Sequence, residues 1–127
     1  MQIEHFGYQV AEPVETARWY VEQLGFSIRR QLGPPTHTHF LADSSGQVMI
    51  EIYRNSKVSV PDYRAMDPLL LHLAILSEDP EADRDRLLAA GATIETDLTT
   101  TDAGDRLVML RDPWGLALQL ACRKNGL

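Results

Sequence analysis

Residues 3–10, IEHFGYQV, and residues 69–76, LLLHLAIL, are the two stretches that decide the fold. Each is rich in apolar and strand-forming residues and carries a single histidine, His5 in the first and His72 in the second. Side chains in the first stretch alternate well enough for a strand with one buried face. We therefore expect the chain to use one structural pattern twice.

The landmarks that follow these stretches repeat at nearly the same interval. Pro13 opens an apolar helical spacing that Gly25 ends, and Pro80 opens a second helix that Gly91 ends. The expected apolar face of the first helix consists of Val14, Ala17, Val21 and Leu24. The step from the first proline to the second equals the step between the two histidines, and the step between the two glycines differs from it by one position. A period this long that occurs twice predicts two copies of a βαβββ module, because an open solenoid needs at least ~3 repeats.

The whole chain then divides into an α+β fold with one linker. Strands are expected at residues 3–10, 26–32, 37–42, 48–53, 69–76, 92–97, 106–110 and 116–122, and helices at residues 13–25 and 80–91. Residues 55–68 lack periodicity and contain two prolines, so they form the linker. We expect a single domain over residues 1–127, with module 1 at about residues 1–54 and module 2 at about residues 69–123.

Composition excludes several classes of protein. The 127 residues suit one domain of roughly 100–200 residues. A net charge of −6, with the charges scattered, argues against a nucleic-acid partner. There is no apolar run of ~20 residues and no leader segment, so we expect a cytoplasmic protein without a membrane span. Cys122 is the single cysteine, expected as an inert core thiol, so any metal is held by histidine and oxygen ligands.

Strand alternation brings polar residues to matching positions. Glu51 shares a strand face with Met49 and Tyr53, and Gln119 stands between two alanines opposite a face of leucines. Each module therefore offers one histidine from its first strand and one Glu or Gln from its last strand. His37 and His39 share a face of another strand and could extend the same cavity, with Met49 and Tyr53 in its wall; we expect them as substrate-pocket residues.

Two imidazoles and one or two side-chain oxygens suit a divalent metal ion with open positions for water or substrate. Each polar residue alone could equally be a hydrogen-bonded residue of a sheet. However, both modules hold a histidine and then Glu or Gln at equivalent positions, and chance alone is a poor explanation for this match. We therefore expect one ion of zinc, nickel, cobalt, manganese or iron per site. The predicted ligands are His5, Glu51, His72 and Gln119.

These residues carry a family resemblance. The segments that carry it are IEHFGYQV (3–10), WY (19–20), LGF (24–26), VMIEI (48–52), LLHLA (70–74), DPWG (112–115) and LQL (118–120). Together they resemble the vicinal oxygen chelate superfamily, which includes glyoxalase I, methylmalonyl-CoA epimerase, extradiol dioxygenases, and fosfomycin and bleomycin resistance proteins. The resemblance implies the paired, cup-shaped sheet of that family and the same four metal ligands, as in a glyoxalase I-like member.

The resemblance departs from the family pattern at the fourth ligand. Dioxygenases and fosfomycin enzymes rely on a Glu where this chain has Gln119. Bacterial glyoxalase I uses His, Glu, His, Glu, and the epimerase uses His, Gln, His, Glu. The order here resembles the epimerase set with its halves exchanged. Gln9 also stands where bacterial glyoxalase I has a basic residue that binds glutathione, which weakens the expectation of glutathione chemistry.

The resulting expectation is a glyoxalase I-like lyase or isomerase, or an epimerase, that moves a proton next to a carbonyl of a small chelating substrate. Glu51 is the expected catalytic base. The alternative is a metal-free protein that sequesters a ligand, resembling bleomycin resistance proteins, and the acidic charge would suit a cationic drug. We also expect a homodimer, because modules of this size leave open sheet edges.

Overall fold

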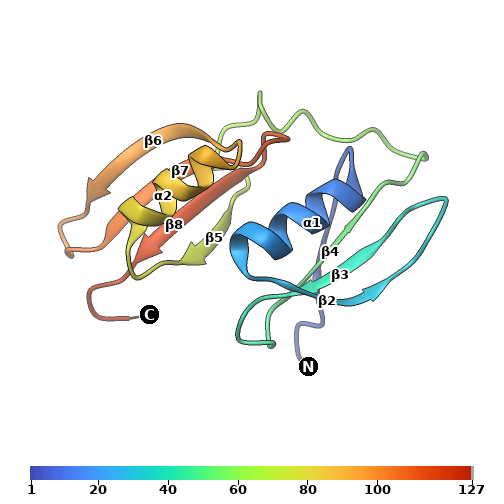
Figure 1. Cartoon of the computed structure of the whole chain (residues 1–127), viewed down its shortest axis with the longest axis horizontal. Helices are drawn as coiled ribbons and strands as arrows, with labels where there is room; N and C mark the ends of the chain where they lie inside the picture. Colours follow the sequence, from blue (N-terminus) through green and yellow to red (C-terminus); the bar gives the residue numbers. More distant parts are fainter. Residues whose placement is uncertain (127) are drawn as a thin grey trace. The chain divides into compact units, whose positions relative to one another are not determined.

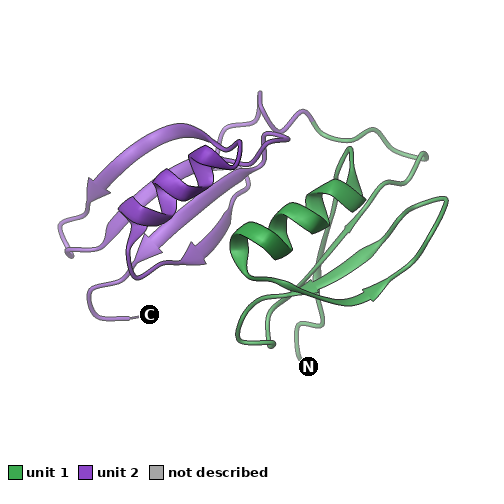
Figure 2. Cartoon of the chain, in the orientation of Figure 1, with its two compact units in different colours: residues 1–61 green, residues 62–127 purple. Residues whose placement is uncertain are grey.

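The computed structural model describes residues 1–126, and the chain separates into two compact units, residues 1–61 and a second unit that begins at Asp62 (Figure 2). Each unit contains one four-stranded mixed sheet and one helix, in the chain order strand, helix, and three strands (Figure 1). The expected α+β fold of two βαβββ modules is confirmed. No helix within residues 1–126 has the length and apolar character needed to cross a membrane.

Unit 1 places its core between one helix and one sheet face. Its elements are β1 (Phe6–Gln9), α1 (Pro13–Leu24), β2 (Ser27–Gln31), β3 (His39–Ala42) and β4 (Met49–Tyr53). The strand order is β1-β4-β3-β2, in which β1 runs parallel to β4 and the other neighbours are antiparallel. Contacts of α1 with β2, β3 and β4 show that the helix covers one face of this sheet. Glu51 of β4, which stands between the buried Ile50 and Ile52, lies on the other face.

Helix α1 begins at Pro13 and ends before Gly25, as predicted. Gly25 adopts the left-handed conformation with φ 70°, and its N–H donates to the carbonyl of Tyr20. The expected apolar face of the helix was wrong in part, because Val14 is 39% exposed. Aromatic side chains bury more area than valine and take the core-facing positions instead. The buried residues of the helix are Pro13, Thr16, Ala17, Trp19 and Tyr20.

Unit 2 repeats this arrangement. Its elements are β5 (Leu73–Leu76), α2 (Pro80–Ala89), β6 (Thr93–Thr100), β7 (Arg106–Arg111) and β8 (Ala117–Cys122). The strand order is β5-β8-β7-β6, with β5 parallel to β8. Helix α2 contacts β6, β7 and β8, and its first turn is capped by Asp79, whose carboxylate accepts the N–H of Ala82 at 3.1 Å.

The first strand of each unit is shorter than predicted. Strand β1 begins at Phe6 and β5 begins at Leu73, so both histidines lie just before their strands. In unit 2 the reason is a turn at Asp67, whose carboxylate accepts the N–H of Leu69 at 2.8 Å. An aspartate that bonds the backbone two residues ahead stabilises a turn in place of an extended strand.

Strand β8 shows the expected leucine face. Leu118 and Leu120 of the strand are buried, as is Leu116 just before it. Cys122 ends the strand and is partly exposed, and its Sγ lies 3.8 Å from the carbonyl oxygen of Glu78. The expectation of a buried core thiol was therefore wrong, because the strand reaches the border of the core at this residue.

Candidate functional site

Glu51 lies in the middle of β4, on the face of the sheet opposite α1. Its neighbours Ile50 and Ile52 are buried in the core, so alternation directs the Glu51 side chain to the other face, where it is 22% exposed. In register, Glu51 stands between Gly7 of β1 and Phe40 of β3. The parallel neighbour β1 brings the segment before Gly7 close to the carboxylate.

The structure brings His5 and Glu51 together. The Nε2 atom of His5 lies 3.3 Å from Oε2 of Glu51, and the Nδ1 atom contacts the carboxylate of Glu4. The ring also meets Phe40 edge to face, with the ring centroids 5.4 Å apart. Both ring nitrogens therefore face a carboxylate, and the hydrogen bond with Glu4 is the main reason that the pKa of His5 is raised.

Two predicted pocket residues share this environment. Met49 and Tyr53 flank Glu51 on the same face of β4, and both are partly buried. The ring of Tyr53 approaches Gly7, since its Cε1 atom lies 3.7 Å from the place that a Cβ on Gly7 would occupy. Met49, Glu51 and Tyr53 thus form one strip along β4, with His5 beside its middle residue.

Unit 2 holds the corresponding residues in the same registers. Gln119 of β8 stands between Ala74 of β5 and Met109 of β7. His72 precedes Ala74 by two residues, as His5 precedes Gly7. The Nδ1 atom of His72 lies 2.8 Å from the carbonyl oxygen of Pro68. Because a carbonyl only accepts, Nδ1 carries the proton in the neutral ring, and the lone pair of Nε2 is then the one that a ligand can use.

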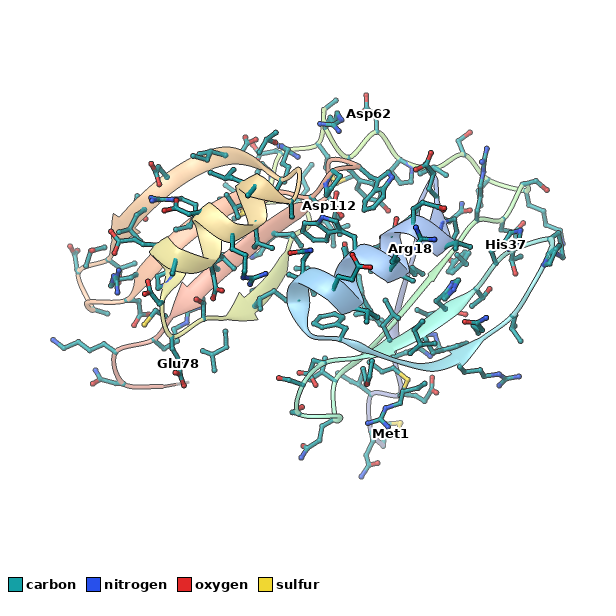
Figure 3. All side chains as sticks on the ribbon, in the orientation of Figure 1. Met1, Arg18, His37, Asp62, Glu78 and Asp112 are labelled. Carbon is teal, nitrogen blue, oxygen red and sulfur yellow. The ribbon has the colours of Figure 1, made fainter. Side chains whose placement is uncertain are left out.

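His37 and His39 do not join the Glu51 strip. His39 pairs with Ile52 across β3 and β4 and is 5% exposed, so it lies on the face that α1 covers. Its Nδ1 is 2.7 Å from the carbonyl oxygen of His37, which sits in a turn with φ 46°. A groove of about 350 Å³ beside α1 is lined by both histidines and by Arg18. Figure 3 labels Arg18 and His37. A sheet separates this groove from Glu51.

The chemistry of the unit 1 pair fits a divalent metal ion. Two ligands that each lie about 2.1 Å from a tetrahedral ion stand roughly 3.4 Å apart, close to the separation of His5 Nε2 and Glu51 Oε2. A carboxylate on the other ring nitrogen is the usual outer partner of a metal-bound histidine. Within residues 1–126, no set of three or more His, Cys, Asp or Glu side chains is gathered as a metal-holding group.

Sequence reasoning missed three neighbours of the pair. Glu4 and Phe40 contact the His5 ring, and Gly7 faces the Glu51 carboxylate. A signal was present for Gly7, because a glycine inside a strand often marks the close approach of another group. For Phe40 no local signal exists, since its contact depends on the register of β3 against β4.

Residues 2–120 match the family model of the glyoxalase/bleomycin resistance protein/dioxygenase superfamily. The chain belongs to this superfamily. Comparison with curated proteins finds no match.

Three solved structures illustrate the range of the superfamily fold. SMU.1112c is 28% identical with a TM-score of 0.73, over 95% of this chain and 98% of that chain. A glyoxalase I variant from Zea mays is 22% identical with a TM-score of 0.76, over 96% of this chain and 45% of that one. TnmS3, an antibiotic binding protein from Streptomyces sp. CB03234, is 19% identical with a TM-score of 0.72, over 98% and 97%. The last two likenesses show the fold alone.

Proposed function

We propose that this superfamily member is a metal-dependent, glyoxalase I-like enzyme, a lyase, isomerase or epimerase that moves a proton next to a carbonyl of a small chelating substrate. The observation that carries the proposal is the 3.3 Å approach of His5 Nε2 to Glu51 Oε2, with the other ring nitrogen engaged by Glu4. The Nδ1 atom of His72 is also engaged, by the backbone carbonyl of Pro68. Both rings thus have Nε2 as the atom that can bind a metal ion.

The proposed ligand set combines the two equivalent pairs. Its ground is the repeat, because each histidine stands two residues before the strand partner of Glu51 or Gln119. A divalent ion of zinc, nickel, cobalt, manganese or iron, when bound, would polarise the substrate oxygens and stabilise negative charge that develops there. The proposed ligands are His5, Glu51, His72 and Gln119.

Glu51 has two tasks in this proposal. It is the one carboxylate of the ligand set, and its carboxylate oxygen is the base that takes the proton beside the substrate carbonyl. His5 holds that carboxylate by contact with Oε2. Gln119 is neutral, so the set has a single negative charge and offers no second base at this position. The return of the proton therefore falls to Glu51 itself, to water or to a residue of the substrate pocket.

One observation favours a second candidate, a metal-free binding protein. His5 already has a carboxylate at each ring nitrogen, so its ring has two polar partners without an ion. The net charge of −6 would suit a cationic ligand.

For either function we propose a homodimer, since each sheet has two edge strands, β1 and β2 in one and β5 and β6 in the other. Sedimentation as a 14.3 kDa monomer at micromolar concentration would contradict the dimer.

The deciding experiment measures metal binding and proton transfer in the same variants. Protein purified without an affinity tag is stripped with a chelator and titrated by calorimetry with Zn²⁺, Ni²⁺, Co²⁺, Mn²⁺ and Fe²⁺. We expect about one ion per chain, lost when His5→Ala and His72→Ala are combined. Full binding in this double variant would show that the site is misplaced.

Proton transfer is followed by solvent deuterium exchange into α-hydroxy carbonyl, hemithioacetal and acyl-thioester compounds. Glu51→Gln should lower exchange by about 10²-fold or more, the usual scale for a lost general base. Glu22→Gln, which removes an exposed carboxylate of α1, is the matched control and should leave exchange unchanged. If the unaltered protein binds none of the ions and catalyses no exchange, the binding-protein candidate replaces the enzyme.

A further inference from the structure

Gly7 is the residue nearest to the Glu51 carboxylate on the neighbouring strand. The two residues are partners in the parallel pairing of β1 and β4. A Cβ atom on Gly7 would lie 2.9 Å from Oε2 of Glu51, closer than such atoms are found, and 3.7 Å from the ring atom Cδ2 of His5. The carboxylate therefore occupies the space that a side chain at position 7 would fill.

The backbone gives no reason for a glycine at this position. Gly7 is absent from the glycines with positive φ in the described chain, which are Gly25, Gly46, Gly91, Gly104, Gly115 and Gly126. Glycine inside a strand weakens the strand, because it has no side chain to pack and loses much conformational freedom. What the residue supplies here is room for a neighbouring group.

Unit 2 has a side chain at the equivalent place. Ala74 is the parallel partner of Gln119, as Gly7 is the partner of Glu51. The residue without a side chain, Gly7, therefore stands beside the carboxylate of Glu51, whereas the methyl group of Ala74 stands beside the amide of Gln119. This difference connects the glycine to the reach of Glu51 and not to the fold that the two units share.

We propose that Gly7 is a positioning residue for the candidate site: the missing side chain lets the Glu51 carboxylate lie over β1 and reach Nε2 of His5. The inference rests on the proposed function only where it concerns metal affinity. A methyl group at position 7 moves Oε2 away from His5, because the carboxylate is the end of a flexible side chain and shifts more easily than the strand. The pair then loses the separation at which both atoms can bind one ion.

The first test is a double-mutant cycle with Co²⁺ as the probe, read by calorimetry and by the visible absorption of the bound ion. Gly7→Ala should weaken Co²⁺ binding by about 10- to 100-fold, the scale for disturbed support of a metal ligand. Glu51→Asp withdraws the carboxylate by one methylene, so adding Gly7→Ala to Glu51→Asp should cost less than about 3-fold more. Equal losses in both backgrounds would overturn the proposal.

The matched control is Gly33→Ala. Gly33 also lacks a positive φ, and a Cβ on it would meet no atom within 4 Å. Its replacement should leave Co²⁺ binding unchanged, and the thermal unfolding midpoint of both alanine variants should stay within a few degrees of the unaltered protein. A Gly33→Ala variant that loses Co²⁺ binding as Gly7→Ala does would assign the effect to glycine replacement in general and overturn the proposal.

The second test needs no metal. The ring nitrogen resonances of His5 in the metal-free protein report its contact with Glu51, and those of His39 report an unrelated ring on the other sheet face. Gly7→Ala should shift the His5 resonances and leave those of His39 in place. If the unaltered protein binds no Co²⁺, the proposed function fails while this arm still tests Gly7. Unchanged His5 resonances would overturn the inference about Gly7 whatever the metal result.

Discussion

Replacing Arg111 by methionine should destabilise unit 2 more than any exposed charge replacement. Arg111 ends β7 and is 8% exposed. One guanidinium nitrogen donates to the carbonyls of Tyr63 at 2.7 Å and Gly115 at 3.0 Å, and the other donates to the carbonyl of Met66 at 3.0 Å. The Nε–H donates to the Glu95 carboxylate at 2.6 Å. A single side chain thus attaches the segment that begins unit 2 to its sheet.

The magnitude follows from what the methionine leaves behind. Three backbone carbonyls lose their donor, and each costs about 1–3 kcal/mol where water cannot replace it. Glu95 is more exposed than Arg111 and regains water, so its share is smaller. Methionine retains most of the apolar contact of the arginine stem. We expect a loss of about 3–5 kcal/mol, the lower part of the sum for three carbonyls that lose their donor, out of a typical total of about 5–15 kcal/mol.

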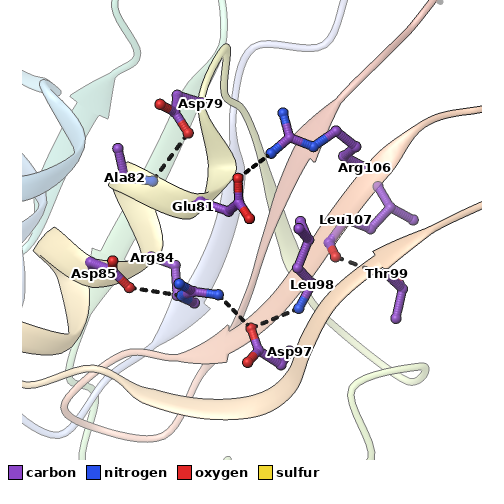
Figure 4. Close-up of polar contacts among 10 residues, drawn as sticks. All are labelled: Asp79, Glu81, Ala82, Arg84, Asp85, Asp97, Leu98, Thr99, Arg106 and Leu107. Atoms are coloured by element: carbon purple, nitrogen blue, oxygen red, sulfur yellow. Dashed lines mark hydrogen bonds and ion pairs between the residues drawn. The ribbon is translucent and has the colours of Figure 1, made fainter.

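Urea unfolding followed by circular dichroism measures this loss, with Arg106→Met as the matched control. Arg106 donates to the Glu81 carboxylate at 2.7 Å on the surface of the same unit (Figure 4). An exposed pair of this kind contributes under about 1 kcal/mol. If Arg111→Met costs no more than Arg106→Met, the carbonyl contacts do not stabilise the fold and the reasoning is refuted. Limited proteolysis near Tyr63 should increase in Arg111→Met alone.

Three further outcomes are expected. Thr16→Val removes a buried hydroxyl without a hydrogen-bond partner, so urea unfolding should show equal or higher stability, by up to about 2 kcal/mol; a loss above about 1 kcal/mol would contradict this. Burial raises the pKa of Asp83, but hydrogen bonds from Ser77 and Arg86 outweigh it and hold the pKa below its ordinary value of 3.8. The ionised Asp83 therefore stabilises the fold fully at a pH above 3.8, and this stabilisation is lost as the pH falls through the lower pKa of the folded state. In Asp83→Asn, the free energy of unfolding should accordingly fall less steeply on acidification than in the unaltered protein. The double variant Glu51→Gln, Gln119→Glu moves the carboxylate to unit 2, where Ala74 is its strand partner. Calorimetry should show metal binding as tight as in the unaltered protein only when Ala74→Gly is added. Full binding without this third change would show that the methyl group of Ala74 does not crowd a carboxylate at position 119.

The sequence predicted the order of elements and the face of Glu51 well, because both depend on local patterns. Alternation around Glu51 is a property of consecutive residues of β4, and the structure confirms that Ile50 and Ile52 turn to the core. The starts of β1 and β5 were placed too early. A side chain such as Asp67 can hold the following residues in a turn by bonding the backbone, which delays the start of the strand, and an apolar run such as residues 69–72 does not reveal that competition.

The relation between strands could not be read from one strand at a time. His39 and Glu51 lie on opposite faces of the same sheet because His39 pairs with Ile52, in the antiparallel pairing that follows the turn between β3 and β4, where the Asp43 carboxylate accepts the N–H of Gly46. Arg111 was missed for a related reason. Its partners Tyr63 and Met66 lie far from it along the chain, in a segment that the sequence marks as a linker. Contacts of this range leave no periodic signal in the chain.

The repeat predicts which positions correspond, but it does not predict that the two copies differ in charge. His5 has a carboxylate at each ring nitrogen, from Glu4 and Glu51, whereas the Nδ1 of His72 meets the neutral carbonyl of Pro68. In unit 1, Gly7 has no side chain, and the Glu51 carboxylate lies where a Cβ atom would stand. In the proposed site, unit 1 therefore supplies the negative charge and the base, and unit 2 supplies neutral ligands. Substitutions in unit 1 should accordingly affect both metal binding and proton transfer, whereas those at His72 and Gln119 should affect metal binding first.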